Sequence, residues 1–350
     1  MHMVYGRAQH YAWGDLSAIP QMVGLTPDGQ PWAEWWMGTH PLAPSTLDDG
    51  APLQSIAGEL PYLLKLMAAA QPLSLQTHPN HLQAEAGYER EEQLGIPRDS
   101  PLRTYRDPFA KPEMLCALTT FDTLCGFRLV DDTVALLREI GADDLAAMLR
   151  HEKLATTVDA LYRRQFDITS TIAACRHHDR VEASLVAELA DAYPDDPSVA
   201  VTLLLNRVLL GPGEAVSLGP GNLHAYLRGF GVEVMGNSDN VVRGGLTVKH
   251  VDVEELLDVL DFEPLEQPVV HAVEVEPGWW RYHTPNTPYA VSRCEVSTGT
   301  RRRHQAVGRE LLLHVDGAHR GECQFLADGE TADLAGRASI FVVQEPLRAG

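Results

Sequence analysis

Two polar side chains, Gln76 and His78, stand two positions apart inside an otherwise apolar, strand-like segment, residues 71–80. Successive side chains of a strand point to opposite faces, so these two share one face and lie about 6–7 Å apart along it. A buried amide and a buried imidazole both need hydrogen-bond or metal partners. The pair is therefore a candidate for half of a metal site, with a hydrogen-bonded pair in the core as the alternative.

Further nitrogen and oxygen donors occur in two later segments. Glu113 begins an apolar run, and His224 follows two Gly-Pro-Gly turns, an arrangement that can present a histidine at the start of a strand. Two imidazoles, one carboxylate and one amide suit Zn²⁺ or another first-row divalent ion. Taken singly, each has a simpler explanation: a solvated glutamate at a strand edge, or a histidine packed in an ordinary hairpin.

Lysine is rare in this chain, and the positions of the few lysines are informative. Only four of the 28 lysines and arginines are lysine. Lys65 and Lys111 lie near the segments described above, and Lys249 ends the glycine-rich stretch at 233–249. An ammonium group is a compact point charge that can lose its proton, whereas guanidinium is a permanently charged fork. In a chain that otherwise uses arginine, this placement favours phosphate binding or proton transfer.

A glycine-rich stretch, residues 233–249, carries Asp239 and Arg243 between apolar runs. An arginine in a buried strand is costly unless it meets an anion. We therefore expect a cleft that binds an anionic, hydroxyl-rich ligand. A purely structural Asp239–Arg243 ion pair is the alternative.

The chain as a whole narrows the class of protein. A length of 350 residues allows two or three domains with a sizeable core, and the net charge of −20 argues against binding nucleic acid or an anionic membrane surface. Five scattered cysteines without a C-x-x-C motif indicate free thiols in a reducing compartment. The N-terminus has no apolar signal segment and no 18-residue apolar run occurs, so we expect a cytoplasmic protein without a membrane span.

The residue pattern changes twice along the chain and predicts β-rich, helical and again β-rich parts. Short apolar runs between Pro and Gly predict strands at 62–67, 72–78, 114–118, 214–218, 231–235, 271–275 and 340–343. Helix-favouring charged residues ended by Gly95 predict a helix at 81–95. Asp131-Asp132-Thr133 can cap a helix at 131–140, and Asp143-Asp144 can start one at 143–149. A third candidate is 183–193, and Asp196-Pro197 fits the start of a helix that leads into 199–205. We predict a mainly β fold with an α insertion, its short strands forming sandwiches or jelly rolls.

Several motifs, in a fixed order, resemble type I phosphomannose isomerases. They cover residues 11–14, 33–41, 65–80, 111–118, 219–227 and 233–249. The resemblance implies a metal-binding cupin-type jelly roll (1–128 and 206–262), a helical insertion (129–205) and a C-terminal cupin-like β domain (263–350). It is weak after Pro264. Ala110 stands where family members often have histidine, so that position has no proton-transfer role here.

The resemblance also implies roles for individual residues. The residues that match the family's zinc ligands, for one Zn²⁺ per subunit, are Gln76, His78, Glu113 and His224. Arg243 matches its catalytic arginine. The candidates for proton transfer are Glu233, Lys249 and Asp239. Glu233 is the preferred base, because partial desolvation raises a carboxylate pKa toward neutrality. Residues in or near the substrate pocket are Lys65, Lys111 and Tyr226, with Lys111 the first choice for the phosphate.

The implied activity is the interconversion of D-mannose 6-phosphate and D-fructose 6-phosphate through a cis-enediol, a step of carbohydrate metabolism that serves GDP-mannose biosynthesis. Zn²⁺ would act as a Lewis acid and as a template. We expect a monomer whose partner is a sugar phosphate. One alternative is a cupin metal oxygenase, which Gln76 and the lysines fit poorly. Another is a non-catalytic sugar-binding cupin, which the intact ligand, arginine and lysine positions disfavour.

Overall fold

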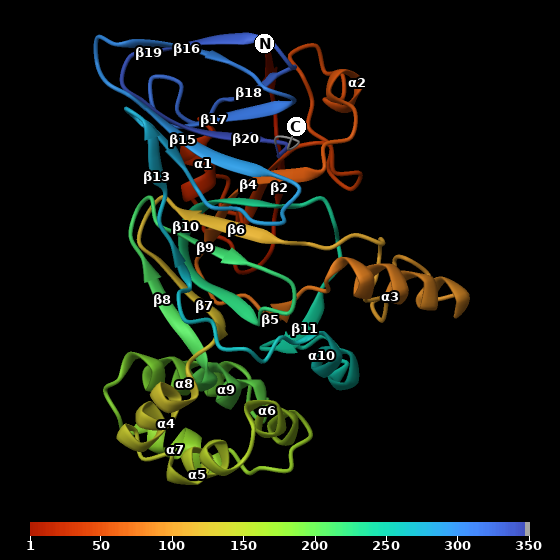
Figure 1. Cartoon of the computed structure of the whole chain (residues 1–350), viewed down its shortest axis with the longest axis vertical. Coiled ribbons are helices and arrows are strands. Elements are labelled where there is room, and N and C mark those ends of the chain that lie inside the picture. Colours follow the sequence, from red (N-terminus) through yellow and green to blue (C-terminus); the bar gives the residue numbers. More distant parts are fainter. Residues whose placement is uncertain (347–350) are drawn as a thin grey trace.

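The computed structural model describes residues 1–346, in which strands predominate and ten α-helices occur. Figure 1 shows three layers along the long axis: a sheet of mainly C-terminal strands, a central sheet, and a group of helices. The mainly β character with a helical part between two β parts confirms the coarse prediction from the sequence.

The central sheet carries every predicted site residue that lies in a strand. Within residues 1–346 it has eleven strands, and its main path is β12 (Val269–Val270), β9 (Ala215–Leu218), β6 (Glu113–Ala117), β10 (His224–Gly236), β4 (Tyr62–Ala69), β3 (Glu34–Met37) and β2 (Arg7–Gln9). The strands off this path are β5 (Leu75–Thr77), β7 (Phe121–Phe127), β8 (Leu205–Leu210) and β11 (Val242–Gly245). β10 pairs antiparallel with β4, β5, β6 and β7, so it joins most of the sheet together.

The second large sheet combines both ends of the chain. Its order is β1 (His2–Val4), β18 (Cys323–Leu326), β17 (Glu310–Gly317), β20 (Ala338–Gln344), β15 (Ala290–Val296), β14 (Trp279–Arg281) and β13 (Val273–Glu276). A separate pair of strands is β16 (Arg301–Gln305) and β19 (Thr331–Ala335). One apolar core, which includes Leu64, Val232, Leu311 and Phe341, joins the two large sheets.

The helical group lies in the chain between β7 and β8. Its helices are α4 (Val130–Glu139), α5 (Asp143–His151), α6 (Leu154–Tyr162), α7 (Thr169–Arg176), α8 (Val181–Ala192) and α9 (Ser198–Val201). The helices predicted at 131–140, 143–149 and 183–193 are confirmed to within about two residues. The helix predicted at 199–205 is wrong as a single element, because α9 gives way to a 3₁₀ turn and β8 begins at Leu205. α6 and α7 were not predicted, and neither has a side-chain cap.

Four helices lie outside this group: α1 (Ala18–Met22), α2 (Gln54–Ala57), α3 (His81–Gln93) and α10 (Val253–Val259). The predicted helix at 81–95 is α3, which begins with a capping box between Asn80 and Gln83. An Arg90–Glu255 ion pair of 2.6 Å joins α3 to α10. In Figure 1, α3 projects from the body and α10 lies close to β11.

Two predictions about the whole chain can be compared with residues 1–346. All five cysteines are free and buried there, as expected from their scattered positions. No helix in this part of the chain has both the length and the apolar character that a bilayer crossing requires.

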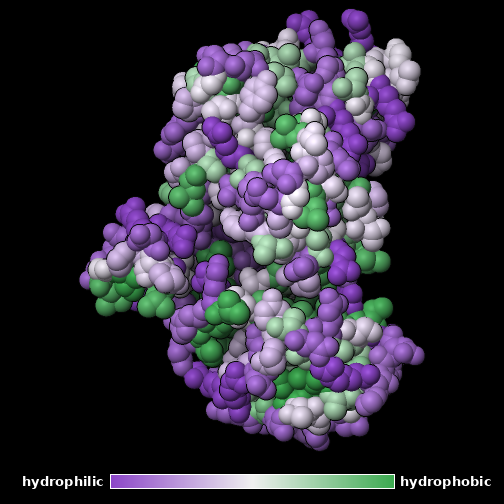
Figure 2. All heavy atoms as spheres, turned by 180° about the vertical axis from the view of Figure 1, so that it is seen from behind, coloured by the Kyte–Doolittle hydropathy of each residue, from purple (hydrophilic) through white to green (hydrophobic). Residues whose placement is uncertain are grey.

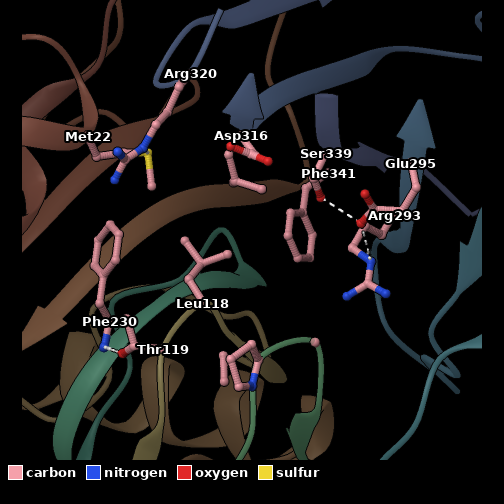
Figure 3. Close-up of a pocket in the computed structure, with 14 residues that line it drawn as sticks. Met22, Leu118, Thr119, Phe230, Arg293, Glu295, Asp316, Arg320, Ser339 and Phe341 are labelled. Carbon is pink, nitrogen blue, oxygen red and sulfur yellow. Dashed lines mark hydrogen bonds and ion pairs between the residues drawn. The ribbon is translucent and has the colours of Figure 1, made fainter. Parts of the chain in front are cut away.

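A cavity of about 350 Å³ opens between the two large sheets (Figure 3). Arg293, Asp316 and Phe341 line it from the C-terminal strands, and Thr119 and Phe230 from the central sheet. None of the predicted site residues lines this cavity. The chemistry therefore has to be sought elsewhere on the central sheet.

Candidate metal centre and active site

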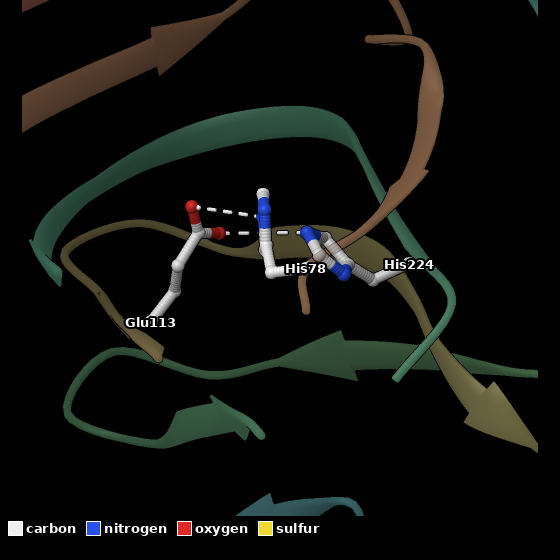
Figure 4. Close-up of side chains that lie close together, drawn as sticks. All are labelled: His78, Glu113 and His224. Atoms are coloured by element: carbon white, nitrogen blue, oxygen red, sulfur yellow. Dashed lines mark ion pairs between the residues drawn. The ribbon is translucent and has the colours of Figure 1, made fainter. Parts of the chain in front are cut away.

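Three of the four predicted metal ligands converge in the central sheet (Figure 4). One ligand atom from each of His78, Glu113 and His224 lies within 4.8 Å of the others. Glu113 Oε1 is 3.2 Å from His78 Nε2, and Glu113 Oε2 is 3.4 Å from His224 Nε2. All three side chains are at most 2 % exposed, so the cluster is shielded from bulk water.

Strand pairing brings these donors together. Glu113 is the first residue of β6, His224 is the first residue of β10, and His78 directly follows β5. The register places Gln76 opposite His224 on one side and opposite Arg243 on the other. Directly opposite residues of an antiparallel pair point to the same face. The half-buried Gln76 therefore lies beside the cluster, as its predicted role requires.

Backbone carbonyls fix the orientation of both imidazoles. His78 Nδ1 lies 2.8 Å from the Asn240 carbonyl oxygen, and His224 Nδ1 lies 2.9 Å from that of Asn222. A carbonyl oxygen only accepts, so each Nδ1 donates and each Nε2 presents its lone pair to Glu113. This arrangement is typical of histidines that ligate a metal.

The unpaired atoms of the cluster fit a divalent cation. Within residues 1–346, the Nε2 atoms of His78 and His224 and Oε2 of Glu113 are buried without a hydrogen-bond partner. Leaving such atoms unpaired is costly, and a bound cation would satisfy all three. Burial lowers the pKa of His78 to about 4, which keeps it neutral as a ligand must be. The donors are those that Zn²⁺ prefers.

Lys111 lies against the metal cluster. Its Nζ is 3.0 Å from Glu113 Oε1, and its side chain is only 10 % exposed. Burial raises the pKa of Glu113, but the positive charge of Lys111 and the contacts with His78 and His224 outweigh this, so that the pKa falls well below its usual range. Lys111 thus keeps the carboxylate ionised.

A second buried polar group lies in the same sheet, on the neighbouring strands β3, β4 and β10. Lys65 Nζ is 2.8 Å from Glu233 Oε2 and 3.3 Å from Glu34 Oε1. Burial by itself lowers the pKa of Lys65, yet the two carboxylates raise it overall, so the lysine stays charged. Burial raises the pKa of Glu233, although Lys65 opposes this. Tyr226 is buried beside Glu233, and its pKa is raised well above the usual value by burial and then by that carboxylate.

Glu34 was missed as a site residue, although the segment at 33–41 resembles the family. Its register position on β3 brings it to Lys65, which lies on the neighbouring strand. In the sequence, Glu34 is only a single glutamate before two tryptophans. That pattern also fits a glutamate exposed to solvent at the edge of a strand.

Asp239 lies on the more open side of the cluster, with its side chain 27 % exposed. Its Oδ1 is 3.4 Å from Nε2 of the buried His40, another residue that the sequence left without a role. Burial raises the pKa of Asp239, but the His40 hydrogen bond and the charges of Lys111 and Arg106 lower it overall. In residues 1–346 no ion pair joins Asp239 to Arg243, so the structural ion pair considered above is not formed.

Arg243 is half-buried on β11, next to Gln76 in register. Burial lowers the pKa of its guanidinium, and the like charge of Arg106 adds to this effect. An anion bound beside Arg243 would favour the charged guanidinium and so oppose this lowering of its pKa.

The helical group holds the end of the strand that carries Arg243. Tyr162 O–H donates to the Gly244 carbonyl oxygen at 2.5 Å, and Leu246 N–H donates to Ser198 Oγ at 3.1 Å. Gly245 has φ +123°, and a Cβ there would lie 2.1 Å from Ser198 Oγ. Only glycine allows this close approach.

Asn240 ties the loop at 106–109 to the metal cluster. Its side-chain Nδ2 donates to the carbonyl oxygens of Asp107 at 2.7 Å and Phe109 at 2.9 Å. Its Oδ1 accepts from Arg106 N–H at 2.7 Å, while its own carbonyl accepts from His78. The loop at 106–109 is therefore held at a set position relative to a predicted metal ligand.

Lys249 is the predicted site residue that the structure does not bring to the cluster. It is exposed in the segment after β11, and its backbone N–H donates to Thr247 Oγ1. Seen from behind in Figure 2, the surface is hollowed between the arm that carries α3 and the main body. The loop that follows this arm leads to Arg106 and Lys111.

Sequence comparisons point to one family. The model of the phosphomannose isomerase type I catalytic domain matches residues 1–130. The mannose-6-phosphate isomerase of Escherichia coli K12 is 36 % identical, covering 98 % of this chain and 97 % of that protein. The Salmonella typhimurium protein of the same name is 37 % identical over 75 % of each chain.

Solved structures agree with the sequence comparisons. A lysine-to-alanine variant of phosphomannose isomerase from Salmonella typhimurium superimposes with a TM-score of 0.89 at 32 % identity, covering 99 % of this chain and 100 % of that one. A zinc-bound holo form of mannose 6-phosphate isomerase superimposes with a TM-score of 0.87 at 30 % identity, covering 99 % of each chain. The likeness thus extends beyond Pro264, where the sequence motifs were weak.

Proposed function

Since the chain belongs to the type I phosphomannose isomerase family, we propose that its buried His–Glu–His cluster is the zinc centre at which a mannose-6-phosphate isomerase works. The protein is a zinc-dependent aldose–ketose isomerase that interconverts D-mannose 6-phosphate and D-fructose 6-phosphate. The observation that carries the assignment is the convergence of three buried, unpaired donor atoms on His78, Glu113 and His224. Gln76 is the proposed fourth ligand, because it lies opposite His224 in register.

The domain boundaries inferred from the sequence stay proposals. We assign residues 1–128 and 206–262 to a metal-binding cupin-type jelly roll, 129–205 to a helical insertion and 263–350 to a second cupin-like domain. Supporting this division, helices α4 to α9 all fall within the proposed insertion. β1 is shared, since it pairs with β18 of the C-terminal part. The monomeric state and the cytoplasmic location also stay predictions.

The reaction moves a proton between C2 and C1 of the sugar, and we propose a cis-enediol as its intermediate. When bound, zinc supplies Lewis acidity and a template for the oxygen atoms of the substrate. Arg243 is the proposed stabiliser of the negative charge that develops on those oxygens, because it is half-buried and lies opposite Gln76 in register. A fixed positive charge in a partly dry site stabilises such a charge without reorganisation.

Asp239 is the proposed base, in place of Glu233. A base must first reach the proton that it removes, and only then does its pKa decide its strength. The Glu233 side chain is 2 % exposed and held by Lys65, whereas Asp239 is 27 % exposed beside His40. The raised pKa of Glu233 favours a base, but its nearly complete burial and its ion pair with Lys65 do not.

Metal removal tests the overall assignment. The purified protein should interconvert the two sugar phosphates, lose this activity on exhaustive chelation and regain it on adding zinc. Metal analysis should find about one zinc per chain before chelation and none after it. Activity that survives complete removal of the metal would show that the reaction does not depend on this centre.

Replacing Arg243 by alanine should lower kcat by about 10²–10³, the usual effect of removing one group that stabilises developing charge. Zinc content should stay unchanged, because the guanidinium is not a ligand. Steady-state kinetics and metal analysis of the purified variant measure both quantities. A kcat within a few-fold of the parent enzyme would exclude this role for Arg243.

A further inference from the structure

Arg106 belongs to the loop that Asn240 ties to the metal cluster, and it has no task in the mechanism described above. It is half-buried in the loop between α3 and β6. Within residues 1–346, neither Arg106 nor Arg243 forms an ion pair with a carboxylate. In a chain with a net charge of −20, two half-buried guanidinium groups without such partners are unexpected.

The loop that carries Arg106 packs against the residues just before β11. Asp107, the next residue, accepts hydrogen bonds from Ser238 Oγ and from Asp239 N–H, each at 2.8 Å. The positive charge of Arg106 adds to the lowering of the pKa of Arg243, for which burial is the main cause. Two guanidinium groups that are close to each other repel, and an anion bound beside one of them offsets that repulsion.

The loop that carries Arg106 is held in place before any ligand binds. Arg106 N–H donates to Asn240 Oδ1 at 2.7 Å, and the carbonyl of the same asparagine accepts from His78 Nδ1 at 2.8 Å. Asn240 is fully buried, so these bonds are protected from water. Asn240 thus holds the backbone of Arg106 at a set position relative to His78, a proposed zinc ligand. Because this position is set before a ligand binds, the entropic cost of binding the ligand is lower.

Lys111, the first choice for the phosphate from the sequence, already has a carboxylate partner. Its Nζ lies 3.0 Å from Glu113 Oε1, and its side chain is 10 % exposed. Much of its charge therefore serves to compensate the buried carboxylate of a proposed zinc ligand. Arg106 has no such partner within the described residues, and a guanidinium fork can bind a phosphate through two parallel hydrogen bonds.

We propose that Arg106 binds the phosphate group of the sugar phosphate. The inference rests on the proposed function of the metal centre, and it adds a specificity-determining residue to that site. The carbon chain of the substrate then runs from the zinc and Arg243, at the reacting end, toward Arg106 at the phosphate end. The strongly acidic chain repels an anionic substrate over long range, and this local positive charge offsets the repulsion.

The test compares Arg106→Ala and Arg106→Lys with Arg301→Ala, in which an exposed arginine of β16 is replaced. Loss of a charge-assisted hydrogen bond should raise KM for mannose 6-phosphate about 10- to 100-fold in Arg106→Ala, with a much smaller change in kcat. Arg106→Lys should recover part of the loss, since it keeps the charge but not the fork. The Arg301 variant should match the parent enzyme.

Inorganic phosphate provides a measurement that does not depend on turnover. Its dissociation constant, measured by calorimetry on the zinc-loaded protein, should rise by a similar factor in Arg106→Ala and stay unchanged in Arg301→Ala. Unchanged KM and unchanged phosphate binding in Arg106→Ala would overturn the inference while leaving the isomerase assignment intact. A parent protein that binds phosphate through Arg106 but does not isomerise the sugar would contradict the proposed function instead.

Discussion

Replacing His224 with alanine is expected to remove the zinc and with it nearly all isomerase activity. The imidazole is fully buried, and its Nε2 lies 3.4 Å from Glu113 Oε2, so its removal deletes one of the three converging donors. Changing a residue that only orients a ligand typically costs 10- to 100-fold in metal affinity, and losing the ligand itself should cost more than about 100-fold. Zinc content after gel filtration and kcat/KM at limiting zinc measure the two effects.

The matched control is His319→Ala, an exposed histidine on the C-terminal side of β17. It should keep both zinc and activity. Excess zinc should restore part of the activity of His224→Ala, because the other proposed ligands remain. A His224→Ala protein with one tightly bound zinc per chain would contradict the ligand assignment, whatever its activity.

Asp239→Asn should lower kcat by about 10²–10⁴ while zinc is retained, because an amide cannot accept the substrate proton. The amide keeps the size of the side chain beside His40, so the fold should be little affected. Glu233→Gln is the matched comparison, and its expected defect is in stability. The change leaves the Lys65 ammonium buried with one carboxylate instead of two, and breaking a buried pair costs about 3–5 kcal/mol.

Thermal unfolding and steady-state kinetics of the two variants separate these roles. We expect a lower Tm for Glu233→Gln and a lower kcat for Asp239→Asn. The reverse result, a large loss of kcat in Glu233→Gln at unchanged Tm, would return the role of base to Glu233, as its raised pKa first suggested.

Much of the metal centre could be predicted from local patterns. The two-residue spacing of Gln76 and His78, the glutamate at the start of an apolar run and the histidine after two glycine turns each reflect the geometry of one short segment. α3 was equally predictable, because its capping box and its stop at Gly95 involve residues close together in the chain. Such features depend on the backbone geometry of a few neighbouring residues, and that geometry can be predicted from the residue types alone.

The predicted caps show where local reasoning reached its limit. Asp131 and Asp132 lie in the first turn of α4, and its N-cap is Leu129 without a side-chain hydrogen bond. The two carboxylates favour the helix through its dipole and do not cap it. Whether a polar side chain caps a helix or lies inside it depends on the backbone conformation of the preceding segment, which here connects β7 to α4.

What the sequence by itself determined was the set of donors, the order of β and α parts, and the need for a local anion site in an acidic chain. Only the tertiary structure decided which charges meet: Lys65 with Glu34 and Glu233, and Asp239 with His40. It likewise paired β1 with β18 across almost the whole chain. These contacts depend on the register of distant strands and on the burial that follows from it. Register is set by the packing of entire sheets, and no short segment contains that information.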